Sequence, residues 1–170
     1  AAQAEVRALL AAGETGRAYE AYDAFAGVSG RQDAGLLGPI AERELWAVAA
    51  RATADPQLQA EALERLARLG NAQALADLQR MSAEQAGRPA AVVADGALAR
   101  LGDGPALARV AAAAAAPSAR SRTLAAESLR RAGARDRASV LVPLLSDGEY
   151  GVRAAAVDAL AELGYRDAVE

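Results

Sequence analysis

The sequence contains no histidine, no cysteine and no lysine among its 170 residues. Without these residue types the chain has no imidazole base, no thiolate nucleophile and no amine for Schiff-base chemistry, and it lacks the usual nitrogen and sulfur ligands of zinc. Only a mechanism or a metal site built from carboxylates remains open. We therefore expect a protein that is not an enzyme, with no catalytic residue, no tightly bound transition metal and no organic cofactor.

Aromatic side chains and long apolar runs are also scarce, and positive charges do not outnumber negative ones. The chain has one Trp, one Phe and four Tyr, and its formal net charge is −3. Binding to nucleic acid needs an excess of positive charge on one face, so we expect no nucleic-acid partner. The longest alanine run, 111–116, is too short to span a bilayer, so we expect no membrane insertion.

Alanine, by contrast, accounts for about fifty residues, and every basic residue is arginine. Alanine is the best intrinsic helix former, and its small side chain suits closely stacked helix pairs. We interpret the use of arginine without lysine as the codon bias of a GC-rich bacterial genome. The chain starts Ala-Ala-Gln-Ala, which is typical either of an end left by signal peptidase or of a cut chain, and we favour an exported bacterial protein.

A repeated five-residue segment ending in glycine organises most of the chain. Leu-Ala-Arg-Leu-Gly occurs at 66–70 and at 98–102, and related segments lie at 129–133 and 160–164. The closing glycines are Gly70, Gly102, Gly133 and Gly164, separated by 32, 31 and 31 residues. A fixed period of this size is typical of an array in which each unit buries its apolar face against its neighbours. The predicted fold class is all-α, an α-solenoid of stacked antiparallel helix pairs.

Within each unit, one helix precedes the glycine and a second apolar segment follows it. The position four before the glycine holds Leu66, Leu98, Leu129 and Leu160; the position eight before holds Ala62, Ala94, Ala125 and Ala156; the position one before holds Leu69, Leu101, Ala132 and Leu163. These three positions share one side of a helix and predict an inward stripe. The glycine predicts a left-handed helix stop. Each unit is therefore a helix, a tight turn and a second helix such as 138–145.

The last unit carries a family resemblance. The segment 147–164 reads Asp-Gly-Glu-Tyr-Gly-Val-Arg-Ala-Ala-Ala-Val-Asp-Ala-Leu-Ala-Glu-Leu-Gly, with an Asp, a Val-Arg pair, a run of small residues and a Leu-Gly close. It resembles the HEAT repeat family, especially its short bacterial form of about 31 residues. The resemblance covers roughly 36–170 and implies a curved α-solenoid in which the second helix of each pair lines the concave side. Earlier units lack the combination of Asp147 and Arg153, so we expect no continuous Asp–Arg ladder.

The first 30 residues differ from the rest. Gly13, Ala18 and Tyr22 lie at offsets that resemble the turn and second helix of a tetratricopeptide unit. We expect residues 1–30 to form a helical hairpin that caps an array over 31–170, whose last repeat is incomplete. An earlier unit runs through Leu36-Leu37-Gly38 and a helix at 39–53 that carries Trp46. Tyr19, Tyr22 and Phe25, with Trp46, could form a recognition patch, but their helical spacing favours the core of the hairpin.

The candidate partner-binding residues are Arg68, Arg100, Arg131, Arg122, Arg153 and Asp95. The first three share the position two before the glycine and predict a column that could grip an acidic segment. We favour solvated helix ends with weak pairs Glu64–Arg68 and Glu127–Arg131. Asp95 stands where other units are apolar, beside the helix-weakening Gly96. It could join Asp103 and Glu84 in a cation cluster, but we favour a local hydrogen-bond partner.

The leading functional hypothesis is a non-catalytic scaffold that binds a protein or peptide on its concave face. The resemblance also offers a HEAT-like chromophore (bilin) lyase or a lyase-related chaperone, and a HEAT-like DNA-binding protein or glycosylase. Because the sequence ends soon after Gly164, it leaves Val152, Ala155 and Leu163 of the last helix without an obvious polar cover. We expect either a fragment of a longer array or a C-terminal end covered by another molecule, including self-association.

Overall fold

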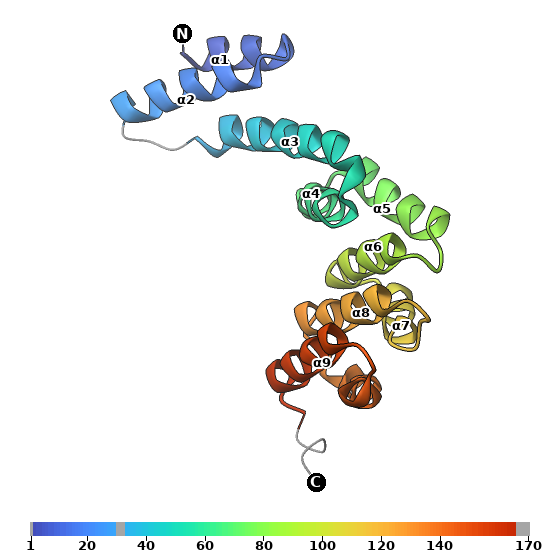
Figure 1. Cartoon of the computed structure of the whole chain (residues 1–170). Coiled ribbons are helices and arrows are strands. Elements are labelled where there is room, and N and C mark those ends of the chain that lie inside the picture. The colour runs from blue at the N-terminus through green and yellow to red at the C-terminus, as the bar shows by residue number, and fades with distance from the viewer. Residues whose placement is uncertain (1, 30–32, 166–170) are drawn as a thin grey trace.

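A computed structural model describes residues 2–29 and 33–165, and all regular structure in this part of the chain is helical, as the sequence predicts (Figure 1). The elements are α1 (Ala2–Ala11), α2 (Thr15–Ser29), α3 (Ala34–Arg51), the 3₁₀ turn η1 (Ala52–Ala54), α4 (Pro56–Arg68), α5 (Ala72–Glu84), α6 (Pro89–Arg100), α7 (Gly104–Ala113), α8 (Ala119–Arg131), the 3₁₀ helix η2 (Arg135–Ser146) and α9 (Tyr150–Leu163). Within the described ranges no helix is both long and apolar enough to cross a membrane.

The helices from α3 to α9 follow a curved path, and the helices that end at a glycine lie on its inner side (Figure 1). Helices α4, α6, α8 and α9 contact one another in succession, whereas α5, α7 and η2 make at most marginal contact with each other. The expectation that the second helix of each pair lines the concave side is therefore wrong. The position eight before the glycine is a buried alanine in all four units, and such small side chains allow the inner helices to approach closely.

The turn that closes each unit is the same four times. Every closing glycine has a positive φ of 63–94°. The N–H that follows the glycine donates to the carbonyl of the leucine four before it, at 3.0–3.1 Å. These leucines, Leu66, Leu98, Leu129 and Leu160, are at most 4% exposed, which confirms the expectation that all four are buried. The same leucine thus fills the core with its side chain and accepts the bond that ends its helix.

The second element of each unit depends on the residue after the glycine. Asn71 and Asp103 accept a hydrogen bond from the N–H three residues later and begin the α-helices α5 and α7. In the third unit that position is Ala134, which has no capping oxygen, and the segment folds as the 3₁₀ helix η2 instead of the expected α-helix. The buried residues of η2 are Ala138, Leu141 and Leu144, and this spacing of three matches a helix with three residues per turn.

Two further expectations need correction. The position before the glycine is not uniformly inward, since Leu69 is 60% exposed. No unit boundary lies at Gly38, because α3 runs without interruption through Gly38 and Pro39, and it starts at an N-cap where Asp33 accepts from the Gly35 N–H at 2.9 Å.

At both ends of the described chain, the burial of aromatic and apolar side chains differs from what the sequence predicts. Among the aromatic side chains of the N-terminal hairpin, only Tyr22 is buried; Phe25 is half-buried and Tyr19 is 53% exposed. In α9, Val152 and Leu163 are buried against α8 and η2, and the exposed apolar residues are Tyr150 and Val157. The segment 166–170, which belongs to the last repeat expected to be incomplete, lies outside the described residues.

Candidate functional site

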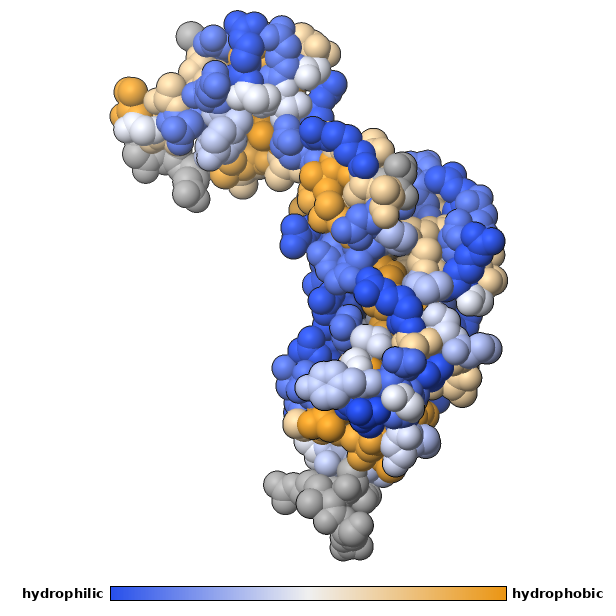
Figure 2. All heavy atoms as spheres, viewed as in Figure 1, coloured by the Kyte–Doolittle hydropathy of each residue, from blue (hydrophilic) through white to orange (hydrophobic). Residues whose placement is uncertain are grey.

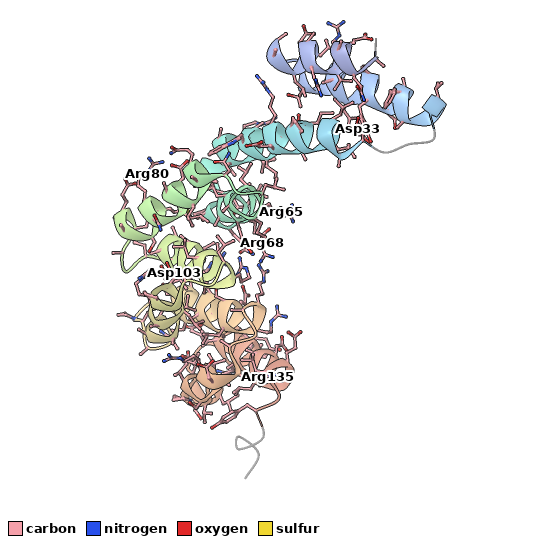
Figure 3. All side chains as sticks on the ribbon, turned by 180° about the vertical axis from the view of Figure 1, so that it is seen from behind. Asp33, Arg65, Arg68, Arg80, Asp103 and Arg135 are labelled. Carbon is pink, nitrogen blue, oxygen red and sulfur yellow. The ribbon has the colours of Figure 1, made fainter. Side chains whose placement is uncertain are left out.

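Arginines from three successive units meet on the inner side of the curve. Arg65 and Arg68 of α4, Arg100 of α6 and Arg131 of α8 line a hollow of about 410 Å³ together with Glu61 and Glu64. We call these six residues the arginine pocket. Arg65 and Arg68 extend from α4 on the inner side, whereas Arg80 lies on the outer side (Figure 3). The view in Figure 2 shows mainly hydrophilic atoms along this inner side, over α4, α6 and α8.

Glu64 is the buried centre of the pocket. Its side chain is only 10% exposed and accepts hydrogen bonds from Arg100 Nε and Nη2 at 2.6–3.2 Å. Arg68 Nη2 donates to the same carboxylate at 2.8 Å. Charge-assisted bonds of this kind fix the orientation of a guanidinium group. The expected pair Glu64–Arg68 is thus present, but Arg100, at 15% exposed, is not a solvated helix end.

Arg131 pairs across the array and not along its own helix. Its Nη1 donates to Glu61 Oε1 at 3.0 Å, although the two residues are 70 positions apart. The expected pair Glu127–Arg131 is replaced by this contact. Arg65 is exposed and makes no ion pair with any described residue. Four guanidinium groups face two carboxylates, so the pocket keeps an excess of positive charge even though the whole chain is acidic.

Arg122 and Arg153 lie elsewhere and hold loops. Each donates from Nη1 to the two carbonyl groups five and six residues before it, at 2.7–3.0 Å. Arg122 Nε and Nη2 also bind both carboxylate oxygens of Asp147 in the next loop, at 2.6 and 2.9 Å. This hydrogen bond, with another from the Glu149 N–H, holds the pKa of Asp147 below its usual value. Because these donors of Arg122 are engaged within the chain, we assign Arg122 to structure and not to partner binding.

Asp95 faces away from the arginine pocket, and its side chain is 8% exposed. Its Oδ1 accepts from Ser82 Oγ at 2.7 Å and from Arg109 Nε and Nη2 at 2.9 and 2.8 Å. The bond to Asp95 raises the pKa of Arg109, so this guanidinium stays charged at neutral pH. Asp103 caps α7 instead of joining Asp95, and no group of acidic residues in the described part of the chain could hold a metal ion. Asp95 therefore has local hydrogen-bond partners, as we favoured.

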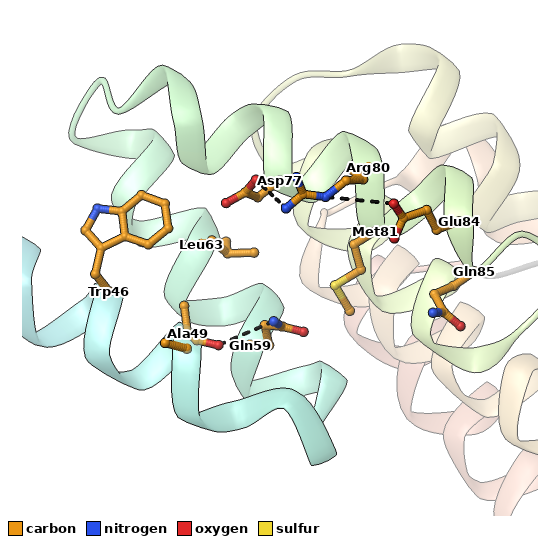
Figure 4. A pocket seen from close by; sticks show the side chains of 10 residues that line it. Trp46, Ala49, Gln59, Leu63, Asp77, Arg80, Met81, Glu84 and Gln85 are labelled. Carbon is orange, nitrogen blue, oxygen red and sulfur yellow. Dashed lines mark hydrogen bonds and ion pairs between the residues drawn. The ribbon is translucent and has the colours of Figure 1, made fainter.

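A second hollow, of about 370 Å³, lies between α3 and α5. Trp46 and Met81 face it from the two helices, Leu63 of α4 lies between them, and Asp77, Arg80 and Glu84 form a chain of ion pairs at its rim (Figure 4). Trp46 is half-buried, so it belongs both to the core beside α4 and to the surface. The lining residues include no hydroxyl or thiol side chain, and the apolar side chains of Trp46, Leu63 and Met81 suit this hollow to an apolar side chain of a partner.

The chain matches no protein-family model, no curated protein and no solved structure. The arrangement of its own residues is therefore the basis for a functional argument. The shared repeat position predicts a column of Arg68, Arg100 and Arg131, and the structure places all three around one hollow, although solvated helix ends were the favoured interpretation. The repeat pattern did not point to Arg65 or to the central role of Glu64. Arg65 could have been found because it precedes Arg68 by three residues and so shares its helix face.

Proposed function

We propose that this protein is a HEAT-like α-solenoid that acts as a non-catalytic scaffold and binds an acidic segment of a protein or peptide partner on its concave face. The observation that carries the proposal is the arginine pocket, in which side chains of three units surround one hollow with more positive than negative charge. Arginine binds carboxylates through paired N–H donors, and a concave face offers several such donors to one extended segment.

The pocket combines fixed and free donors. Arg100 is held by the buried Glu64, so it forms the floor and loses little freedom when a partner binds. Arg65 and Arg68 are exposed and extend from the neighbouring turn of α4. These two residues can therefore contact a partner without breaking the internal ion pair between Glu64 and Arg100. Electrostatic attraction at such exposed groups is screened by salt.

The proposal is tested by selecting binders from a random-peptide display library and measuring their affinities by calorimetry. We expect the selected peptides to be rich in Asp and Glu and to bind more weakly at higher salt. The double variant R65E/R68E should lose at least tenfold in affinity, since it reverses the two exposed charges of the pocket. Both side chains are exposed, and Arg100 still pairs with Glu64 when Arg68 is replaced, so we expect the variant to fold; circular dichroism verifies this before affinities are compared.

The matched control is R120E/R135E, which changes the net charge by the same amount at two exposed arginines that do not line the pocket. It should bind the selected peptides as the native chain does. Equal losses in both double variants would show that only the overall charge matters. Undiminished binding by R65E/R68E would place the partner elsewhere and refute the proposal.

A further inference from the structure

A cavity of about 260 Å³ lies on the side of α6 that faces away from the arginine pocket, between the end of α5, α7 and the start of α8. Most of its wall is formed by small apolar side chains, including Val92, Ala112, Ala113 and Ala116. The alanine run 111–116 contributes Ala112, Ala113 and Ala116, so this part of the wall carries only methyl groups and leaves space open. The cavity thus has an apolar body of a size suited to a small molecule.

Two polar groups in this apolar wall have unused hydrogen-bonding capacity. The three bonds recorded for the Asp95 carboxylate all reach Oδ1, and Oδ2 accepts none from the described residues. Ser121, which is 1% exposed, carries a hydroxyl without a partner in the same part of the chain. Buried polar groups nearly always have partners, so the buried Ser121 hydroxyl and the accessible Asp95 Oδ2 offer two bonding positions to a molecule in this cavity.

The charges in the wall decide which molecules fit. Asp95 and Arg109 carry opposite charges in this wall, so an anion finds no net attraction there to offset the loss of its hydration. A cationic ligand gains little electrostatic attraction, because the Arg109 guanidinium already neutralises Asp95 at 2.8 Å. The cation would also lose its hydration in an apolar wall. A neutral molecule with an N–H or O–H can donate to Asp95 Oδ2 and bond the Ser121 hydroxyl at no such cost. Arg109, half-exposed at 49%, lies between this cavity and solvent.

We propose that this cavity binds a small neutral molecule with a primary amide or hydroxyl group on a short branched apolar body, through Asp95 Oδ2 and Ser121 Oγ. The site is separate from the arginine pocket, and the proposal does not depend on the function proposed above. The molecule contacts the methyl groups of α7 with its apolar end and the two unpartnered oxygens with its polar end.

The test uses four probes that share one branched apolar body: isobutyramide, isobutanol, isobutyrate and isobutylammonium. Each is titrated into the ¹⁵N-labelled chain, and the amide signals of Val92, Ala113 and Ser121 are followed by NMR. We expect saturable shifts with the two neutral probes. The two charged probes should have dissociation constants at least tenfold higher. Equal or tighter binding of a charged probe would show that the proposed ligand class is wrong.

Variants connect the shifts to the cavity. S121A should weaken the affinity for isobutyramide about three- to tenfold, which corresponds to the loss of one hydrogen bond. The other hydrogen bonds in the cavity wall should stay intact. The control S128A removes a second buried hydroxyl of α8 that does not line the cavity, and it should leave the affinity unchanged. A113L should fill the space and abolish the shifts. No saturable shift with either neutral probe would mean that only water occupies the cavity, and unchanged affinity in S121A would exclude Ser121; either result overturns the proposal.

Discussion

At the scale of single residues, Gly96 explains how two inner helices come so close together. A Cβ atom at this position would lie 2.5 Å from Ser128 Oγ and 2.9 Å from Ser128 Cβ, both too short for real contacts. Helix α8 therefore packs on α6 at a point where α6 has no side chain. A glycine that weakens the helix intrinsically is kept because of this tertiary contact.

Gly96→Ala is predicted to destabilise the protein although alanine is the better helix former. The gain in helix propensity is about 1 kcal/mol, but the clash with Ser128 costs about 1–3 kcal/mol and forces the helices apart. Urea denaturation should show a lower free energy of unfolding, and adding Ser128→Gly should restore part of it. The control Gly151→Ala, with no atom within 4 Å of the added Cβ, should not destabilise. Equal effects at both glycines would contradict the close contact.

The second prediction at this scale concerns the leucines that lie four residues before the closing glycines. Leu98 and Leu129 are 1% and 0% exposed, so Leu98→Ala and Leu129→Ala should each lower the free energy of unfolding by about 2–5 kcal/mol. Leu69→Ala serves as the comparison, because Leu69 is 60% exposed. This substitution should lower the free energy of unfolding by less than about 1 kcal/mol. A loss below about 1 kcal/mol at both buried positions would contradict the shared inward stripe.

At the scale of elements, α8 and the loop before α9 share the ion pair Arg122–Asp147, which has no counterpart at the equivalent positions among the described residues of the other units. Arg122 of α8 binds the carboxylate of Asp147 in the loop before α9, and the same guanidinium holds the carbonyl groups of Ala116 and Pro117. The loop before α8 and the loop before α9 are thereby linked through one side chain. Arg153 holds the loop before α9 in the same way, but the described residues offer it no following carboxylate.

This link predicts a pH dependence. Arg122 lowers the pKa of Asp147 in the folded chain, so above the usual Asp value of about 3.9 both folded and unfolded states are ionised and the stabilisation is complete. As the pH falls below that value, the unfolded state takes up the proton first, and the stabilisation is lost. Thermal melts between pH 7 and pH 2.5 should show a smaller acid-induced decrease in Tm for Asp147→Asn than for the native chain. An identical decrease in both would contradict the assignment.

At the scale of the whole molecule, the buried side chains form three clusters along the array. One joins α6 to α9, one joins α3 to α7, and one holds α1 and α2 against the first half of α3. Among the described helices α1 and α2 contact only each other and α3. The N-terminal hairpin therefore has one neighbour, whereas the units of the middle have two, and a one-dimensional array is least stable where neighbours are missing.

Tyr22→Ala should accordingly loosen the hairpin without affecting the other end. Tyr22 is 4% exposed, and its hydroxyl accepts from the Asp33 N–H at 3.1 Å. Hydrogen exchange is expected to become faster over 2–29 and to stay unchanged over 89–165. Tyr19→Ala, at a residue that is 53% exposed on the same helix, is the control and should change neither region. Faster exchange over 89–165 in Tyr22→Ala would show that the array unfolds as one unit.

Much of the local structure followed from the sequence. The period of the closing glycines, the left-handed stops and the burial of the leucines four before them were all predicted, because each depends on backbone conformation and side-chain polarity within one unit. The common position of Arg68, Arg100 and Arg131 predicted a column, but solvated helix ends were favoured, and the bonds of Arg100 to Glu64 and of Arg131 to Glu61 were not predicted. The 3₁₀ form of η2 was missed, although Ala134 in place of a capping residue was a visible signal.

Only the tertiary structure decided how the units face one another and which charges meet. The curvature puts the glycine-ended helices inside, and this brings Arg131 to Glu61 across 70 residues and Arg100 to Glu64 across 36. Likewise, Asp95 takes its partners Ser82 and Arg109 from two other helices. A repeat period fixes which positions are equivalent, but the choice of ion-pair partner depends on distances of a few ångströms between helices, which packing alone sets.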